Sequence, residues 1–331
     1  MGLGRFSTVL QARNREFLRD RMALSWNIVL PVLIVIGFAF AFTSDNRDIF
    51  KVGIHGQQDQ NGGFLDTAYI QFIPVSHIPT AVTKVERHQL DMLLDLAEDR
   101  YWINGGSAKG YILEKLLAAS GLKLARQTVS GEEIRYVDWL IPGVLGMNIM
   151  FSSLFGVGYV IVRYRKNGVL KRLKATPLTP FEFLSAQVAS RLWMITLVTA
   201  LVYAGTDLMV GFRMNGSYIT LLLVLLVGTL SMISLGLIVA ARFANEEAAN
   251  GLLNLISWPM MLLSGVWFSL EGSPAIVQHF ALLLPLTHIT AAARAVMIDG
   301  AGVVEIGMHL LVLMLMAVIF MTIGARSFRW E

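Results

Sequence analysis

The sequence has no cysteine in 331 residues. This absence excludes disulfide bonds, cysteine metal sites and thiol catalysis. Charged residues are also scarce, at 15%, whereas 55% of the residues are hydrophobic. Such a composition is too apolar for an ordinary soluble domain and indicates an integral membrane protein. Lys and Arg on cytoplasmic loops account for the net charge of +4, so we expect no nucleic-acid partner.

Three sequence motifs typical of nucleotide-binding or catalytic sites are absent as well. The sequence contains no G-x-x-x-x-G-K-[ST] phosphate loop, no H-E-x-x-H zinc motif and no G-x-S-x-G nucleophile elbow. We therefore expect no catalytic, cofactor-binding or metal site in this chain. Energy for any transport would come from another polypeptide or from an ion gradient.

Hydropathy predicts six membrane-spanning helices of about 20 residues, the length needed to cross the hydrocarbon core. The expected fold class is thus an all-α polytopic membrane protein. The first span corresponds to residues 23–43, and the other five lie within residues 137–331. The candidate spans are Ala23–Thr43, Trp139–Val162, Leu192–Phe212, Tyr218–Ala241, Leu252–Leu270 and Ile306–Ala325.

The distribution of Lys and Arg sets the expected orientation. Fourteen of these residues lie on the N-terminal segment, on the connections after the second and fourth spans, and at the C-terminus. The short connections on the opposite side carry two. Both termini are therefore predicted to be cytoplasmic, in the plasma (bacterial inner) membrane. The first apolar run follows five arginines and lacks a small-residue cleavage site, which is typical of a signal anchor.

One segment offers an alternative topology. Ser273–Ala293 has no charged residue and could be a seventh span, which would move the C-terminus outside. Pro285 would break a helix near the middle of this segment. We therefore expect a re-entrant or interfacial pair of helices on the outer side, within residues 271–302, packed against protein.

The connection at 163–184 is the most informative stretch. It carries six basic residues and one acid between two candidate spans, so it is predicted to be a cytoplasmic loop. The basic residues could simply enforce topology. Their order, however, predicts a short amphipathic helix after Gly168 that ends at a turn containing Pro177. A second helix is expected to begin with Thr179 as N-cap and Pro180 at its first position.

The N-terminal segment, residues 1–22, has helical spacing of apolar residues with arginines among them. Phe6, Val9, Leu10 and Phe17 fall at i, i+3, i+4 and i+11. This pattern predicts an amphipathic helix in the headgroup plane that leads into the first span. A generic interfacial anchor and a specific contact site are both consistent with it.

Residues 44–136 alone have a soluble composition. Alternating runs predict strands at 50–54 and 69–73, helical spacing covers Val82–Glu98, a strand follows at 101–106, and a second helix spans Tyr111–Ala119. The expected order is β-β-α-β-α, which predicts a small α/β domain inserted outside the membrane between spans one and two.

Asp207 is the acid within a predicted span, so it is a candidate residue of a transport pathway. It lies about five residues from the predicted outer end, where an interfacial hydrogen bond would equally account for it.

Two stretches resemble signatures of ABC-2-type transporter permeases, the membrane subunits of type V-like ABC exporters. The loop at 163–184 resembles the family's coupling region, E-x-G-T-L-E-R-L-x-x-T-P-L-S, although Arg165, Lys166 and Asn167 replace its usual acid before the glycine. The second signature is a broken hairpin between the last two spans with "L-S-G", "P" and "L-P-L-T". The resemblance implies that the ATPase-coupling residues are Gly168, Leu170, Lys171, Arg172, Leu173, Thr176 and Pro177, and that the re-entrant hairpin uses Ser264, Gly265, Pro274, Pro285 and Arg294.

The resemblance also implies the partners. A six-helix subunit with an N-terminal elbow helix would pair with a second permease subunit, identical or related, in the lipid bilayer. Each would dock on a separate ABC ATPase subunit, which would hold ATP-Mg, so this chain would be a transport subunit rather than an enzyme.

Two other classes stay open at this point. A secondary transporter driven by an ion gradient would usually show repeated halves and buried acids at mid-membrane. A membrane-anchored sensor could use the outer domain as a receptor, but it would need a cytoplasmic output domain. Co-purification with an ATPase would separate the exporter from both.

Overall fold

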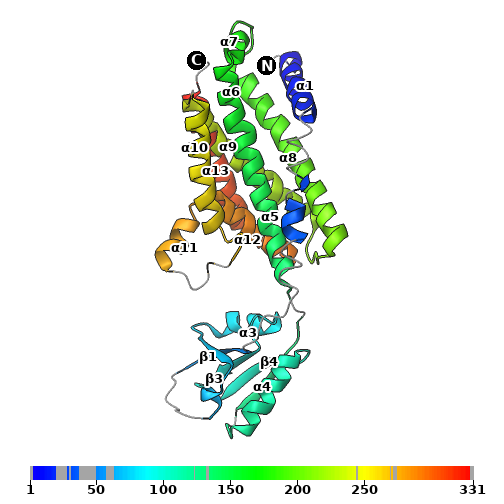
Figure 1. Ribbon diagram of the computed structural model, residues 1–331, viewed down its shortest axis with the longest axis vertical. Helices are drawn as coiled ribbons and strands as arrows, with labels where there is room; N and C mark the ends of the chain where they lie inside the picture. The colour runs from blue at the N-terminus through cyan, green and yellow to red at the C-terminus, as the bar shows by residue number, and fades with distance from the viewer. Residues whose placement is uncertain are drawn as a thin grey trace. The chain divides into compact units, whose positions relative to one another are not determined.

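The computed structural model describes residues 3–19, 28–29, 31–36, 50–56, 63–122, 124–131, 134–243, 245–268, 270 and 274–328. The chain divides into two compact units (Figure 1). Met1–Ala41 and Val137–Glu331 form a helical unit, and Phe42–Tyr136 form an α/β unit. The first predicted span, Ala23–Thr43, lies largely outside the described residues.

The helical unit begins with α1 (Leu3–Arg19). A continuous helical segment then runs through α5 (Tyr136–Ser153), the π-helical η2 (Leu154–Tyr159) and α6 (Val160–Lys166). The short α7 (Val169–Lys174) leads to the long α8 (Pro180–Val210). Five more helices follow along the described part of the chain: α9 (Tyr218–Arg242), α10 (Glu246–Leu263), α11 (Ala275–Ala281), α12 (Pro285–Met297) and α13 (Gly307–Ser327).

Four of the described helices are long and apolar enough to cross a membrane: residues 136–166, 180–210, 218–241 and 307–327. The pair α11 and α12, bent by 90° at its break, would make a fifth if it were one span. This pair agrees with the predicted break at Pro285, which is the first residue of α12. Its placement in the membrane stays a prediction.

The predicted span Leu252–Leu270 has the wrong boundaries. The helix runs from Glu246 to Leu263, and the chain turns at Gly265, whose φ of 66° is left-handed. Its start is fixed by Asn245, whose side chain accepts a hydrogen bond from the backbone N–H of Glu247. Hydropathy does not mark this start because Glu246, Glu247 and Asn250 interrupt the apolar pattern in the first two turns of the helix.

The helix α9 lies at the centre of the helical unit, in contact with α13, η2, α12 and α8. Glycines in both elements allow α9 to pack closely against η2. A Cβ atom added at Gly158 would lie 3.1 Å from the carbonyl oxygen of Gly236, so a side chain there would force the two backbones apart. Within this unit, α1, α7 and the C-terminal end of α13 lie at one end, and α11 and α12 lie toward the other (Figure 1).

The α/β unit contains a five-stranded sheet of order β2-β1-β3-β4-β5. Its strands are β1 (Phe50–His55), β2 (Ile70–Pro74), β3 (Met92–Asp95), β4 (Arg100–Asn104) and β5 (Ala125–Val129). The β3–β4 pair is antiparallel, and the other neighbours are parallel. The helices are η1 (Gly63–Asp66), α3 (Ile78–Glu86) and α4 (Ala108–Ala119).

Two strands of this sheet were missed by the sequence pattern. The predicted helix Val82–Glu98 contains α3 only as far as Glu86, and Met92–Asp95 form β3 instead. Every residue of β3 is buried, so it lacks the alternation by which a strand is recognised. β5, in contrast, is mostly exposed and polar, so it has no apolar pattern to detect.

A hydrophobic core lies on each face of the sheet. Leu113 and Leu117 of α4 pack with Val52, Met92 and Leu94 on one face. On the other face Ala81 and Val85 of α3 pack with Leu93 and Trp102. Met92 and Leu94 serve one core and Leu93 serves the other, which explains why these three successive residues are all apolar.

Candidate functional site

The loop between α6 and α8 is shorter than the predicted range 163–184, because α6 continues to Lys166 and α8 begins at Pro180. Gly168, with a φ of 67°, precedes α7 and turns the chain sharply after α6. The hydroxyl of Thr176 donates to the carbonyl of Leu173 at 2.6 Å, closing the turn after α7. The predicted short helix and its terminal turn are thus confirmed.

Thr179 caps α8 as predicted, with Pro180 in the first turn. The cap is a capping box: the Thr179 hydroxyl accepts from the Glu182 backbone N–H at 3.2 Å, and the Glu182 carboxylate accepts from the Thr179 N–H at 3.0 Å. The sequence prediction missed this role of Glu182, although the T-x-x-E spacing is a signal for it. Both ends of the α7 loop are consequently fixed.

The side chains of α7 divide into a buried and an exposed set. Leu170 is completely buried within the subunit, whereas Lys171 and Arg172 are exposed and Leu173 is half-buried. Leu170 therefore supports α7 from inside and is not available to a partner, which corrects its assignment as a coupling contact. The exposed surface of the loop, from Lys171 to Pro177, is basic and contains no acid.

The helix α1 contacts both α8 and the loop that contains α7. It packs along α8, where the hydroxyl of Ser190 donates to the side-chain oxygen of Asn14 at 2.6 Å. The guanidinium of Arg5 donates to the backbone carbonyl of Pro177. The N-terminal helix thus contacts the turn after α7 as well as the helix that follows it.

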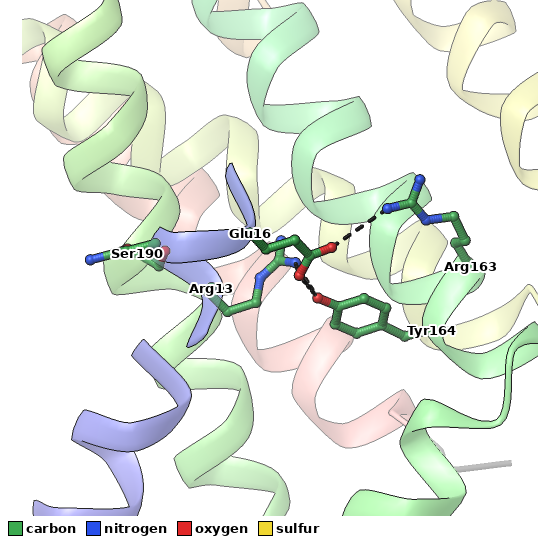
Figure 2. Close-up of polar contacts among 6 residues, drawn as sticks. Arg13, Glu16, Arg163, Tyr164 and Ser190 are labelled. Atoms are coloured by element: carbon green, nitrogen blue, oxygen red, sulfur yellow. Dashed lines mark hydrogen bonds and ion pairs between the residues drawn. The ribbon is translucent and has the colours of Figure 1, made fainter. Parts of the chain in front are cut away.

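A polar cluster joins α1 to α6 (Figure 2). The Glu16 carboxylate accepts from Arg13 at 2.7 Å, from the hydroxyl of Tyr164, and pairs with Arg163 at 3.5 Å. The guanidinium of Arg13 also donates to the Tyr164 hydroxyl and lies over its ring, 5.1 Å from the centroid. Sequence spacing could not reveal this cluster, because about 150 residues separate its two halves.

The end of α6 is tied to α9 and α10 as well. Lys166 pairs with Glu246 at 3.1 Å, in the first turn of α10. The neighbouring Arg165 donates to the carbonyl of Ala240 at 2.9 Å and to that of Phe243. The segment before α7 is therefore linked to α1 on one side and to the α9–α10 turn on the other.

The structure brings together some of the residues predicted for the re-entrant hairpin, in the region from α10 to α12. Ser264 accepts from the hydroxyls of Thr287 and Thr290, through its Oγ at 3.0 Å and its carbonyl at 2.8 Å. Arg294 donates to the carbonyls of Gly265 at 2.5 Å and Trp139 at 3.1 Å. These contacts join the L-S-G segment to the L-P-L-T segment.

The other predicted residues occupy separate positions. Pro274 is the N-cap of α11 and Pro285 the first residue of α12, so both begin helices and neither takes part in the contacts of Ser264. Asp207 lies in the last turn of α8 and is exposed on this subunit, where its carbonyl accepts the capping N–H of Gly211 at 2.8 Å. Across the described ranges, no group of His, Asp and Glu is arranged to hold a metal ion.

Comparison with known proteins identifies the family of this chain. The sequence model of the ABC-2 type transporter family matches residues 4–298. The chain is 28% identical over 188 residues to the inner membrane transport permease YhhJ of Escherichia coli K12, covering 55% of this chain and 49% of that protein. It is 26% identical over 212 residues to nodulation protein J of Rhizobium meliloti, covering 62% and 78%.

A third relative is the daunorubicin resistance ABC transporter permease DrrB1 of Streptomyces coeruleorubidus, with 23% identity over 198 residues, covering 59% of this chain and 69% of that protein. The matches to YhhJ and to the probable multidrug permease YbhS span about half the length of those proteins. Since the family model covers most of the sequence, the chain belongs to the ABC-2 type transporter family.

Proposed function

We propose that this chain is the permease subunit of an ATP-driven exporter in the plasma (bacterial inner) membrane. Two permease subunits, identical or related, form the pathway between them. A separate ABC ATPase docks on α7 of each subunit and holds the ATP-Mg that this chain does not bind. Both termini lie in the cytoplasm, the six spans include residues 23–43, and the α/β unit and the α11–α12 pair lie on the outer side.

This proposal rests on one observation, which is the division of the α7 side chains into a buried and an exposed set. It is a six-residue helix with a buried Leu170 beneath it, and it presents Lys171, Arg172 and the half-buried Leu173 at its surface. An apolar residue among exposed bases suits a contact that combines a small hydrophobic centre with charge complementarity to an acidic partner. A loop that served topology alone would need the charge but no ordered helix.

The contacts around α7 support its role in transmitting motion. Arg5 links the turn after α7 to α1, and Lys166 links the segment before it to Glu246 of α10. A force on α7 would therefore reach α1, α8 and α10 together. We infer that closure of the ATPases moves these helices as a group and switches the pathway.

The test is affinity purification of the full chain from native membranes, with bound ATPase identified by mass spectrometry. Leu173→Asp places a charge in the proposed contact and should cost about 2–4 kcal/mol of binding free energy. We expect this variant to insert normally and to lose its ATPase. The matched control is Val304→Asp, at a 93% exposed position before α13. Equal ATPase recovery from wild type and Leu173→Asp would refute docking on α7.

A further inference from the structure

Two histidines meet where α12 packs against α13. Nδ1 of His288 and Nδ1 of His309 lie 3.0 Å apart, and the ring centroids are 5.3 Å apart. His288 is buried, whereas His309 is half-buried in the first turn of α13. Nε2 of His288 lies 2.9 Å from the carbonyl oxygen of Leu282, which ends α11. The pair therefore connects the start of α13 to α12 and to the end of α11.

The contact with the carbonyl determines which ring nitrogens carry hydrogen. A carbonyl oxygen can only accept, so Nε2 of His288 must donate to Leu282. In the neutral ring the other nitrogen, Nδ1, then has no hydrogen and must accept. The hydrogen between the two rings consequently belongs to His309, whose Nδ1–H donates to Nδ1 of His288. The contact thus requires a neutral His288 and the Nδ1–H form of His309.

One nitrogen of the pair is left to bind a proton. Nε2 of His309 carries the remaining lone pair and has no hydrogen-bond partner among the described residues. A proton that binds there leaves the Nδ1–H of His309 in place. It also turns that group into a charged donor, and charge-assisted hydrogen bonds are stronger than neutral ones. The pair therefore keeps its contact when it holds one proton.

A second proton has the opposite effect. The nitrogen left for it is Nδ1 of His288, which is the acceptor of the hydrogen bond between the rings. Once this nitrogen is protonated, two N–H groups face each other and two like charges lie close together. Neither ring can then accept a hydrogen bond from the other. Protonation of both histidines is therefore incompatible with the contact.

The helices around the pair are largely free of ionisable side chains. No such residue occurs in four stretches that pack against α12 or belong to α13: residues 140–153, 219–241, 248–263 and 310–325. The ionisable residues of the adjoining segments are His279 in α11, Arg294 in α12, and Asp299 and Glu305 between α12 and α13. His279, Arg294 and Glu305 each form hydrogen bonds with backbone groups of their own surroundings. The two imidazole rings therefore respond to protons mainly through each other.

We propose that His288 and His309 form a proton-sensitive contact that holds the start of α13 against α12. The contact is closed when the pair binds no proton or one proton, and it opens when both rings are protonated. Met308 and Leu311, close to His309 in the sequence, are 70% and 65% exposed, so this end of α13 is only partly covered by the subunit. Loss of the histidine contact would free it from α12. Docking of an ATPase is not required by this proposal.

The first experiment is solid-state NMR of the full chain in lipid bilayers with isotope-labelled histidine. At about pH 8 we expect His309 in the Nδ1–H form, His288 in the Nε2–H form and a nitrogen–nitrogen correlation across the hydrogen bond. As the pH is lowered toward about 4, His309 should take the first proton while the correlation persists. The correlation should disappear when His288 becomes charged. The variants His288→Gln and His309→Gln assign the signals of the two rings.

The second experiment measures whether the start of α13 moves. The chain has no native cysteine, so Leu283→Cys and Leu311→Cys provide sites for two spin labels at positions that are 67% and 65% exposed. We expect the distance between the labels to shift to longer values as the correlation disappears. The matched control is His288→Asn combined with His309→Asn, because an amide can donate and accept at the Nδ1 position without taking up a proton. In this variant the distance should not depend on pH.

Four results would overturn the proposal. The first is an absent correlation at about pH 8, or a His309 that carries its hydrogen on Nε2. The second is a correlation that disappears with the first proton, and the third is one that persists down to about pH 4. The fourth is a label distance that is independent of pH in the wild-type background, or equally dependent on pH in the asparagine variant. The NMR measurement does not need the asparagine variant, so the test stays decisive if that variant does not fold.

Discussion

The guanidinium of Arg294 lies 3.6 Å from the ring centroid of Trp139. The same group donates to the carbonyls of Trp139 and Gly265, so one side chain connects α12, the start of α5 and the turn after α10. A cation over a tryptophan ring with two carbonyl acceptors satisfies an arginine that would otherwise be costly in an apolar setting. The bent pair of helices is thereby fixed to the rest of the helical unit.

A double-mutant cycle measures this relationship. Arg294→Met should lower the free energy of unfolding by about 2–4 kcal/mol, because the stacking and two charge-assisted hydrogen bonds are lost. Trp139→Leu keeps the backbone acceptor and should cost less. The two effects should be non-additive by about 0.5–2 kcal/mol in detergent unfolding. Strict additivity would mean that the ring and the guanidinium do not interact.

The turn chemistry of the helical unit could be predicted from the sequence because its signals are local. Gly168 marks the left-handed position before α7, Thr179 and Pro180 mark the start of α8, and Pro285 marks the break before α12. Each of these residues acts through its own backbone or that of a near neighbour. A single sequence is sufficient for such effects.

Contacts between distant segments could not be predicted in this way. The pairing of Glu16 with Tyr164 and the burial of Leu170 depend on which helices meet, and neither follows from local spacing. β3 illustrates a second limit. Met92, Leu93 and Leu94 serve two opposite cores, so their unbroken apolar run fits the pattern of a helix as well as that of a strand.

The membrane orientation can be tested by cysteine labelling, since the chain has no native cysteine. Cysteines at the exposed Lys109 and Arg213 should react with an impermeant thiol reagent added outside. Cysteines at the exposed Asn167 and Arg326 should react only after permeabilisation. Labelling of Arg326→Cys from outside would mean that α11 and α12 form a true span. Asn104 is unsuitable as a reporter, because its buried amide donates to the carbonyls of Glu86 and Gly131.

The α/β unit should fold when residues 42–136 are expressed alone, because it contains cores on both faces of its sheet. We expect a mixed α/β circular dichroism spectrum and a cooperative thermal transition. Leu113→Ala should cost about 2–5 kcal/mol, since Leu113 is fully buried in the core under α4. A random-coil spectrum for the wild-type fragment would show that the unit depends on the helical unit for its order.

Tyr101 should make the unfolding free energy of the same fragment depend on pH. Burial raises the pKa of the Tyr101 phenol, and the hydrogen bond that it donates to Glu114 at 2.9 Å raises it further. The folded state therefore disfavours the phenolate. Its contribution to stability is present below the unfolded-state pKa of about 10 and is lost as the pH rises through the folded-state pKa.

Comparison with Tyr101→Phe isolates this contribution from lysines that titrate nearby. The unfolding free energy of wild type should fall more steeply than that of the variant between about pH 9 and pH 12. Parallel curves for the two proteins would contradict the raised pKa.

Cross-linking at α7 tests the proposed docking of an ATPase most directly. Leu173→Cys places a single thiol at the proposed contact, and Val304→Cys places one at an exposed position before α13. A short bifunctional reagent that joins thiols to amines is applied to native membranes containing either variant. We expect Leu173→Cys to cross-link to an ABC ATPase and Val304→Cys to give no such product. Membranes in which both thiols react with the reagent but neither variant yields an ATPase adduct would contradict docking on α7.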